Sequence, residues 1–275
     1  MNHRFTFVFG VLAALIGCSS SESGPAVDAG ADGGRSCPAT GGTMARVQGM
    51  CIDRTEVTRG EYGAFLPNAA ALDKSKLSAE CQGISAFAPD ATCDASSVPG
   101  CGANCGEYPQ TCVNYCQAEA FCVAAGKTLC GDALGSQVAI SATRVPSDLA
   151  WYSICGNGVR IDGFPNRRYA YGNDFQPGLC TDTTVACPGD GSSCRSEPVG
   201  KRSQCRLPEA EVFDMAGNVS EWLRAKEIPE VEGGRHAFAG SSRSTLGSQT
   251  GRCQDLGLGA PAYFSEDLGF RCCAK

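Results

Sequence analysis

The chain has 275 residues, with 23 Lys and Arg against 29 Asp and Glu, which gives a formal net charge of −6. An acidic chain without clustered basic residues lacks the positive patch that general nucleic-acid binding requires, so we expect no nucleic-acid partner. The 19 cysteines predict disulfide bonds formed in an oxidising compartment.

The first residues are typical of an export signal. Arg4 is followed by an apolar run over 5–17, which is too short for a stable membrane span. The run ends in Leu-Ile-Gly-Cys, which resembles the lipobox of bacterial lipoproteins, where the thiol of Cys18 receives a diacylglycerol. The alternative is an ordinary signal with an incidental cysteine. Because Ser19 follows Cys18, we expect a lipid anchor in the bacterial outer membrane, with the protein facing the periplasm or the cell surface.

We therefore predict three parts: residues 1–18 as a lipoprotein signal peptide, 19–42 as a flexible tether, and 43–275 as one domain. The tether is small, polar and Gly-rich, so it buries too little apolar surface to offset the entropy lost on ordering. No repeat of roughly 20–50 residues is present, which excludes a solenoid or propeller.

The domain begins with short elements. Apolar and β-branched residues predict strands within 43–52 and 55–57, and a short helix over 59–66. Residues 67–110 are rich in Pro, Gly, Ser and Asp and contain four cysteines. We expect this segment to be a long loop held by disulfides.

The clearest predicted helix follows this loop. Apolar residues recur at spacings of three and four from Val113 to Ala124, and Gly126 stands where a glycine commonly ends a helix. Cys116 and Cys122 lie six positions apart and therefore face different sides of the helix. We expect them to bond to different partners.

A second helix is predicted to start at Ser147, as its N-cap, and to end at Gly156. Residues 156–211 are again loop-like, and short strand-like pieces occur at 212–213 and 270–272. Few helices and much loop predict an α+β fold.

Two cysteine pairs have spacings that a zinc site could use, Cys101 with Cys105 and Cys112 with Cys116. The domain has a single histidine, His236, and export favours disulfides over zinc. The shortage of histidine also argues against Ser-His-Asp or Cys-His catalysis, because His236 would have to be the only imidazole base.

Six segments, in this order, are similar to motifs of the formylglycine-generating enzyme (sulfatase-modifying factor) family. They are Asp-Arg-Thr-Glu-Val-Thr at 53–58 with Tyr62 and Phe65, Gly-Lys-Thr-Leu at 126–129, Arg-Val-Pro-Ser-Asp-Leu-Ala-Trp at 144–151, Tyr-Ala-Tyr-Gly-Asn at 169–173, Phe-Asp-Met-Ala-Gly-Asn-Val-Ser-Glu-Trp at 213–222 and Leu-Gly-Phe-Arg-Cys at 268–272. The resemblance covers residues 43–275. It implies the family's variant of the C-type-lectin-like fold, an α+β domain low in regular secondary structure.

The resemblance also implies two disulfides, Cys122 with Cys272 and Cys155 with Cys253. Each would join distant parts of the chain and restrict the unfolded state by roughly 3–5 kcal/mol. The pairing of the other cysteines stays open, because spacing alone does not determine connectivity.

A calcium site is implied as well. In the family, side chains and backbone carbonyls hold calcium at positions that match Asp214, Gly217, Val219 and Glu221. A hard cation prefers such a set of oxygens. The alternative is an acidic turn without an ion, and Ser220 stands where the family motif usually has Trp.

Active members of the family oxidise a substrate cysteine to formylglycine with Cu(I) held by two thiolates. The matching positions fall at 243–244 and 248–249, where Ser244 and Ser248 stand, and no cysteine occurs over 206–252. Hydroxyl and amide groups are poor ligands for Cu(I). We therefore expect no copper and no catalytic residues of the family type.

These observations predict a cell-envelope lipoprotein with a non-catalytic domain of this family, acting in binding or in surface structure. Its expected partners are the membrane, through the N-terminal lipid, and a protein or glycan ligand. The alternative is a formylglycine-generating oxidase or a related oxidoreductase acting on protein cysteine. A groove lined by polar groups at Ser244 and Ser248 would favour the binding role.

Overall fold

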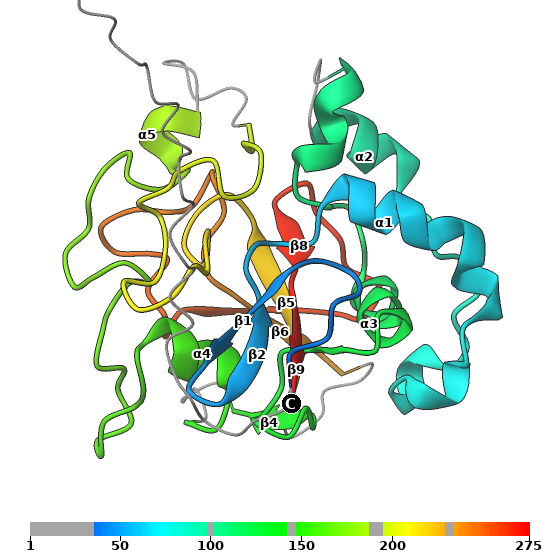
Figure 1. Cartoon of the computed structure of the whole chain (residues 1–275), viewed down its shortest axis with the longest axis horizontal. Coiled ribbons are helices and arrows are strands. Elements are labelled where there is room, and N and C mark those ends of the chain that lie inside the picture. Colours follow the sequence, from blue (N-terminus) through cyan, green and yellow to red (C-terminus); the bar gives the residue numbers. More distant parts are fainter. Residues whose placement is uncertain (1–35, 98–101, 142–146, 187–194, 229–233) are drawn as a thin grey trace, which may run out of the picture. The chain divides into compact units, whose positions relative to one another are not determined.

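The computed structural model describes residues 36–97, 102–141, 147–186, 195–228 and 234–275 (Figure 1). The compact unit runs from Ser36 to Lys275. Cys18, the predicted signal peptide and the tether up to residue 35 lie outside the described residues. Among the described residues, no helix has both the length and the apolar character of a membrane span.

The first sheet is antiparallel, with the strand order β1-β2-β9-β3. Its strands are β1 (Met44–Val47), β2 (Met50–Asp53), β3 (Thr128–Leu129) and β9 (Cys272–Ala274). Gln48 and Gly49 between β1 and β2 have φ of 51° and 80°, as a tight two-residue hairpin turn requires. Because β9 pairs with β2, this sheet joins the two ends of the domain. The strand expected over 55–57 does not form.

The second sheet is built around β5, which is drawn in yellow at the centre of Figure 1. β6 and β4 are neighbours of β5, β7 pairs with β6, and β8 runs parallel to the first residues of β5. The strands are β4 (Val138–Ile140), β5 (Ser220–Glu227), β6 (His236–Ala239), β7 (Leu256–Gly259) and β8 (Leu268–Phe270). Most of β5 is buried, since strands contact it on both edges.

Two of the predicted helices form as expected, and both begin with a capping box. In α1 (Arg59–Phe65) the cap is Thr58 with Glu61, and α3 (Tyr115–Ala124) begins at Asn114. α3 ends before Gly126, which has φ of +74° and so takes the left-handed conformation that favours glycine.

The predicted start of the second helix is wrong. α4 (Ala150–Cys155) begins after Leu149, without a side-chain cap. The backbone N–H of Ala150 donates instead to the carbonyl of Gly131. A tertiary contact therefore replaces the local cap expected from Ser147. The end of the helix at Gly156 is as predicted.

The segment 67–110 contains more helix than expected. Five short helices lie wholly or mostly within it: η1 (Leu66–Ala71), η2 (Lys74–Lys76), η3 (Ala79–Cys81), α2 (Ala91–Ser97) and η4 (Gly102–Glu107). A further short helix, α5 (Thr183–Ala186), lies in the loop-rich segment after α4.

The described residues form seven disulfides. They are Cys37–Cys51, Cys81–Cys116, Cys93–Cys112, Cys122–Cys272, Cys130–Cys273, Cys155–Cys253 and Cys180–Cys205. The two pairs implied by the family resemblance are both present. Cys116 and Cys122 have different partners, as their positions on the helix predicted. Cys105 is disulfide-bonded too.

The core has two large parts. One surrounds Trp151 of α4 and the buried faces of β4, β5 and β6. The other packs α1 and α3 against β8 through aromatic rings, with the Phe121 and Phe270 centroids 5.5 Å apart. β5 contributes to both parts, so the motif that leads into this strand is held from two sides.

Candidate functional site

The segment 213–219, which leads into β5, is a buried turn with an unusual backbone. Asp214, Gly217 and Asn218 have φ of 58°, 82° and 55°, all in the left-handed region. A Cβ added to Gly217 would lie 2.5 Å from the carbonyl oxygen of Thr181, so only glycine fits there. The conformation of the turn thus depends on its close contact with the segment around residue 181.

Asn218 connects this turn to three other segments. Its Nδ2 donates to a carboxylate oxygen of Glu56 at 3.1 Å, and its Oδ1 accepts from the backbone of Glu197. Its carbonyl accepts from the backbone N–H of Arg243 at 2.8 Å. The turn is therefore hydrogen-bonded directly to the stretch at 243–249, which matches the family's cysteine positions.

Glu221, three residues after Asn218, forms a buried ion pair with Arg271. Arg271 donates from Nε and Nη2 to the two carboxylate oxygens of Glu221, each at 2.7 Å. Trp151 donates its indole N–H to the same carboxylate at 2.8 Å. All three side chains are buried. Both oxygens of Glu221 are therefore engaged by protein donors.

Two more carboxylates are buried beside this pair. Burial, followed by repulsion from Asp214, raises the pKa of Glu56 well above its usual range. Burial also raises the pKa of Asp214 to about 6, opposed by a hydrogen bond from the backbone of Gly200. One oxygen of Glu56 is buried without a hydrogen-bond partner among the described residues. Three carboxylates thus share the single guanidinium of Arg271.

Three of the four expected calcium positions, Asp214, Gly217 and Val219, lie on this turn, and the fourth, Glu221, lies in β5. Both oxygens of Glu221 are bound to Arg271 and Trp151, and one oxygen of Asp214 accepts from Gly200. The described residues contain no group of three or more His, Cys, Asp or Glu side chains placed to hold a metal. Calcium held by Asp214, Glu221 and the carbonyls of Gly217 and Val219 stays a prediction.

A groove of about 520 Å³ lies beside the stretch at 243–249, between β6, β7 and the loop before β8. None of the described residues that line it is a cysteine. The polar side chains of the lining are Ser220, Ser241, Ser242, Thr245, Gln249, Thr250, Asp255, Ser265 and Asp267. The groove is thus rich in hydroxyl and carboxylate groups at the place where the family's thiolates would be expected.

Ser244 and Ser248 are placed differently with respect to this groove. The hydroxyl of Ser244 donates to Asp267 and contacts Ser242, two residues that line the groove. Ser248 is outside the lining, and its carbonyl accepts from the hydroxyl of Tyr169 at 2.9 Å. Neither serine is therefore among the residues that line the groove: Ser244 lies behind the wall formed by Ser242 and Asp267, and Ser248 contacts Tyr169 through its backbone.

Arg243 lies behind the same wall and is the feature that the sequence did not reveal. Its side chain is 1% exposed, and its Nη2 is 3.0 Å from Asp267 Oδ1. Burial lowers the pKa of the guanidinium, and the charges of Asp267 and Glu266 oppose this. A buried cation thus stands at one of the positions that match a family thiolate.

His236 lies in β6 outside the groove lining. It is fully buried and stacked on Tyr115, with ring centroids 3.5 Å apart, and its Nε2 is 3.1 Å from a carboxylate oxygen of Glu80. It therefore serves as a core residue that joins the segment 67–110 to β6.

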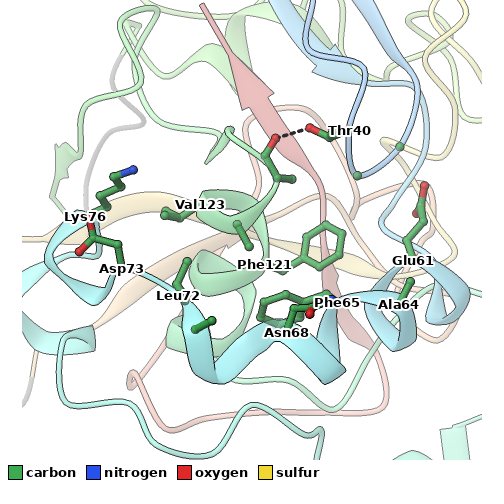
Figure 2. A pocket seen from close by; sticks show the side chains of 15 residues that line it. Thr40, Glu61, Ala64, Phe65, Asn68, Leu72, Asp73, Lys76, Phe121 and Val123 are labelled. Atoms are coloured by element: carbon green, nitrogen blue, oxygen red, sulfur yellow. Dashed lines mark hydrogen bonds between the residues drawn. The ribbon is translucent and has the colours of Figure 1, made fainter.

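A second cavity of about 590 Å³ lies between α1, η1 and α3. Figure 2 shows the rings of Phe65 and Phe121 at its centre, with Glu61 towards one end and Asp73 and Lys76 towards the other. The sequence did not indicate this cavity. The apolar residues that line it have the spacing of ordinary core residues on two separate helices.

Comparison with known proteins places these features in a family. The profile described as "Sulfatase-modifying factor enzyme 1-like domain" matches residues 24–275. The matched region begins within the predicted tether. A search of curated proteins gave no match.

Among solved structures, the chain is similar to CarF, with TM-score 0.50 and 22% identity over 82% of this chain and 85% of that chain. It also matches PvdO from Pseudomonas aeruginosa, with TM-score 0.45 and 20% identity over 82% of this chain and 79% of that chain. A third match is Treponema denticola variable protein 1, with TM-score 0.47 and 18% identity over 82% and 84%. The α+β architecture, low in regular structure and rich in disulfides, is the predicted variant of the C-type-lectin-like fold. The chain belongs to the sulfatase-modifying factor (formylglycine-generating enzyme) family.

Proposed function

We propose that this protein is a cell-envelope lipoprotein whose domain binds a ligand and does not oxidise cysteine. The observation that carries the proposal is the groove beside residues 243–249. Among the described residues, its lining combines hydroxyl, amide and carboxylate groups with aromatic and aliphatic side chains and contains no cysteine. Cys253, which follows the stretch in sequence, is bonded to Cys155. Polar groups of this kind bind ligands well but are poor Cu(I) ligands.

The lipid anchor is supported by the apolar run that ends at Cys18. The many disulfides agree with export to an oxidising compartment. Expression with a radioactive fatty acid, followed by intact mass measurement, would test the anchor. We expect label on the wild-type chain and none on Cys18→Ala. Label retained by Cys18→Ala would contradict the proposed site.

The alternative, an oxidase acting on protein cysteine, is tested by incubating the purified protein with copper, oxygen and a cysteine-containing peptide of the sulfatase type. We expect no aldehyde, because no thiolate lines the groove. Aldehyde formation that is lost in a Cys253→Ser variant would show that the disulfide opens to supply a ligand, and would overturn the non-catalytic proposal.

A further inference from the structure

We propose that the groove binds a neutral sugar, with the ring of Tyr263 as a stacking surface and with Thr245 and Asp255 as hydrogen-bond acceptors. This inference rests on the proposed function, because it names the class of ligand for the same groove. It is carried by three features of the lining: its charge, the direction of its hydroxyl groups, and one half-exposed aromatic ring.

The charge of the lining opposes an anionic ligand. No Lys or Arg is among the described residues that line the groove, whereas Asp255 and Asp267 both line it. The charge of Asp267 is balanced from behind by the buried guanidinium of Arg243 at 3.0 Å. Asp255 accepts from the backbone N–H of Arg252 through one oxygen at 2.9 Å, which leaves its second oxygen to accept from a ligand.

The hydroxyl groups of one wall point their protons into the protein. Ser244 donates to the carboxylate of Asp267, so its oxygen must accept in the contact with Ser242 at 2.9 Å. Ser242 has then used its only proton, so Thr245 must donate in their contact at 3.1 Å. Thr250 donates to the carbonyl of Thr245. Each of these hydroxyls has therefore used its proton internally.

This polarity determines what the wall can recognise. Thr245 also accepts from the backbone N–H of Ser242 at 2.9 Å, which leaves one lone pair on its hydroxyl. Thr245, Thr250 and the second oxygen of Asp255 therefore offer lone pairs and no protons on this wall, so the ligand must supply the donors there. A sugar carries several hydroxyl donors on a rigid ring, which limits the entropy lost on binding. The rest of the lining also offers donors, since the amide of Gln249 and the hydroxyls of Ser241 and Tyr263 have protons to donate. A sugar hydroxyl can both donate and accept, whereas a phosphate or carboxylate would place only acceptors against Thr245, Thr250 and Asp255.

The ring of Tyr263 supplies the apolar surface. It is 46% exposed and lines the groove. It is stacked on Phe238, with centroids 6.4 Å apart and an interplanar angle of 20°, and meets Trp222 edge to face. A Cβ on Gly259 would lie 2.9 Å from the Tyr263 ring, so glycine makes room for it. A fixed, half-exposed ring beside hydrogen-bond acceptors can contact the C–H face of a pyranose.

The test uses the purified full-length chain and neutral trisaccharides of glucose, galactose, mannose and N-acetylglucosamine, on a glycan array and by isothermal titration. A sialylated trisaccharide and a Gly-Ser peptide are the comparison ligands. We expect saturable binding of at least one neutral trisaccharide. Tyr263→Ala should weaken it about tenfold or more, and Thr245→Val about tenfold. Tyr263→Phe should bind like the wild type.

The matched control is Phe264→Ala, which removes a neighbouring aromatic side chain, 40% exposed, that is outside the lining, and should leave binding unchanged. Near-ultraviolet circular dichroism checks that each variant is folded. The sugar proposal is overturned if no neutral trisaccharide binds, if Tyr263→Ala binds as well as wild type, or if the sialylated sugar binds best. If only the peptide binds, and Tyr263→Ala abolishes this binding, the sugar proposal is overturned but the proposed binding function stands. Aldehyde formation in the oxidase assay would overturn the proposed function itself.

Discussion

Replacing Asp214 with Asn should stabilise the folded protein at neutral pH. Asp214 is buried near Glu56 and Glu221, and burial raises its pKa to about 6 from an ordinary 3.8. The shift of about two units corresponds to roughly 3 kcal/mol at about 1.4 kcal/mol per unit. Because Glu56 and Glu221 lie nearby and share the charge repulsion with Asp214, we expect a gain of roughly 2–3 kcal/mol in the free energy of unfolding. Asn keeps an oxygen acceptor for Gly200 and tolerates the left-handed backbone, φ 58°, at this position.

The pH dependence has a definite sign. The folded-state pKa of Asp214 lies above its unfolded value, so the ionised carboxylate destabilises the fold at every pH above about 6. The penalty disappears as the pH falls towards the ordinary value of 3.8. The stability difference between Asp214→Asn and wild type should therefore be largest near neutral pH and vanish in acid.

The assay is guanidinium unfolding followed by circular dichroism at neutral and acidic pH, with a chelator present. Asp73→Asn is the matched control, because Asp73 is exposed and its pKa is lowered by hydrogen bonds from Ser75. Asp73→Asn should lower the free energy of unfolding at neutral pH. This loss should fade as the pH falls below 3.8, the ordinary pKa of Asp. An Asp214→Asn variant that is less stable than wild type at neutral pH in chelator would refute the reasoning.

The same pair of proteins tests calcium. If Asp214 and Glu221 hold calcium, added calcium should raise the unfolding temperature of the wild type and not of Asp214→Asn. Equal behaviour of both proteins in calcium and in chelator would contradict the predicted calcium site, because a bound ion stabilises only the state that holds it.

Three further predictions concern the fold. The double variant Cys122→Ala with Cys272→Ala should lose roughly 3–5 kcal/mol of stability in urea unfolding, because the pair closes a long loop; an unchanged midpoint would contradict this. Arg271→Met should cost about 3–5 kcal/mol by leaving buried Glu221 unpaired, and the loss should shrink when Glu221→Gln is added, as a double-mutant cycle would show. Gly217→Ala should expose the domain to limited proteolysis, since its Cβ would meet backbone at 2.5 Å, whereas Gly63→Ala, with open space around the Cβ position, should not.

Local signals were sufficient for several elements. The ends of α3 and α4 were predicted from Gly126 and Gly156, which stand where glycine commonly ends a helix. The capping boxes of α1 and α3 are equally local, since each joins residues within one turn. The order of six motifs identified the family, and with it the pairs Cys122–Cys272 and Cys155–Cys253. The absence of thiols over 206–252 was also evident from the residues themselves.

Other features were decided by contacts between distant segments. α4 starts at Ala150 because its first N–H reaches the carbonyl of Gly131, which no pattern near Ser147 could indicate. Arg271 binds Glu221 from 50 positions away. These pairings depend on which strands lie beside one another.

The groove was also decided by contacts between separate segments of the chain. Its hydroxyl groups come from Ser220, from 241–250 and from Ser265, its carboxylates from Asp255 and Asp267, and its rings from Phe238 and Tyr263. Residue types and local spacing therefore determined the family and the lack of thiolates. Only the tertiary structure decided which side chains share a cavity and where each hydroxyl proton points, because hydrogen-bond direction depends on partners brought together by folding.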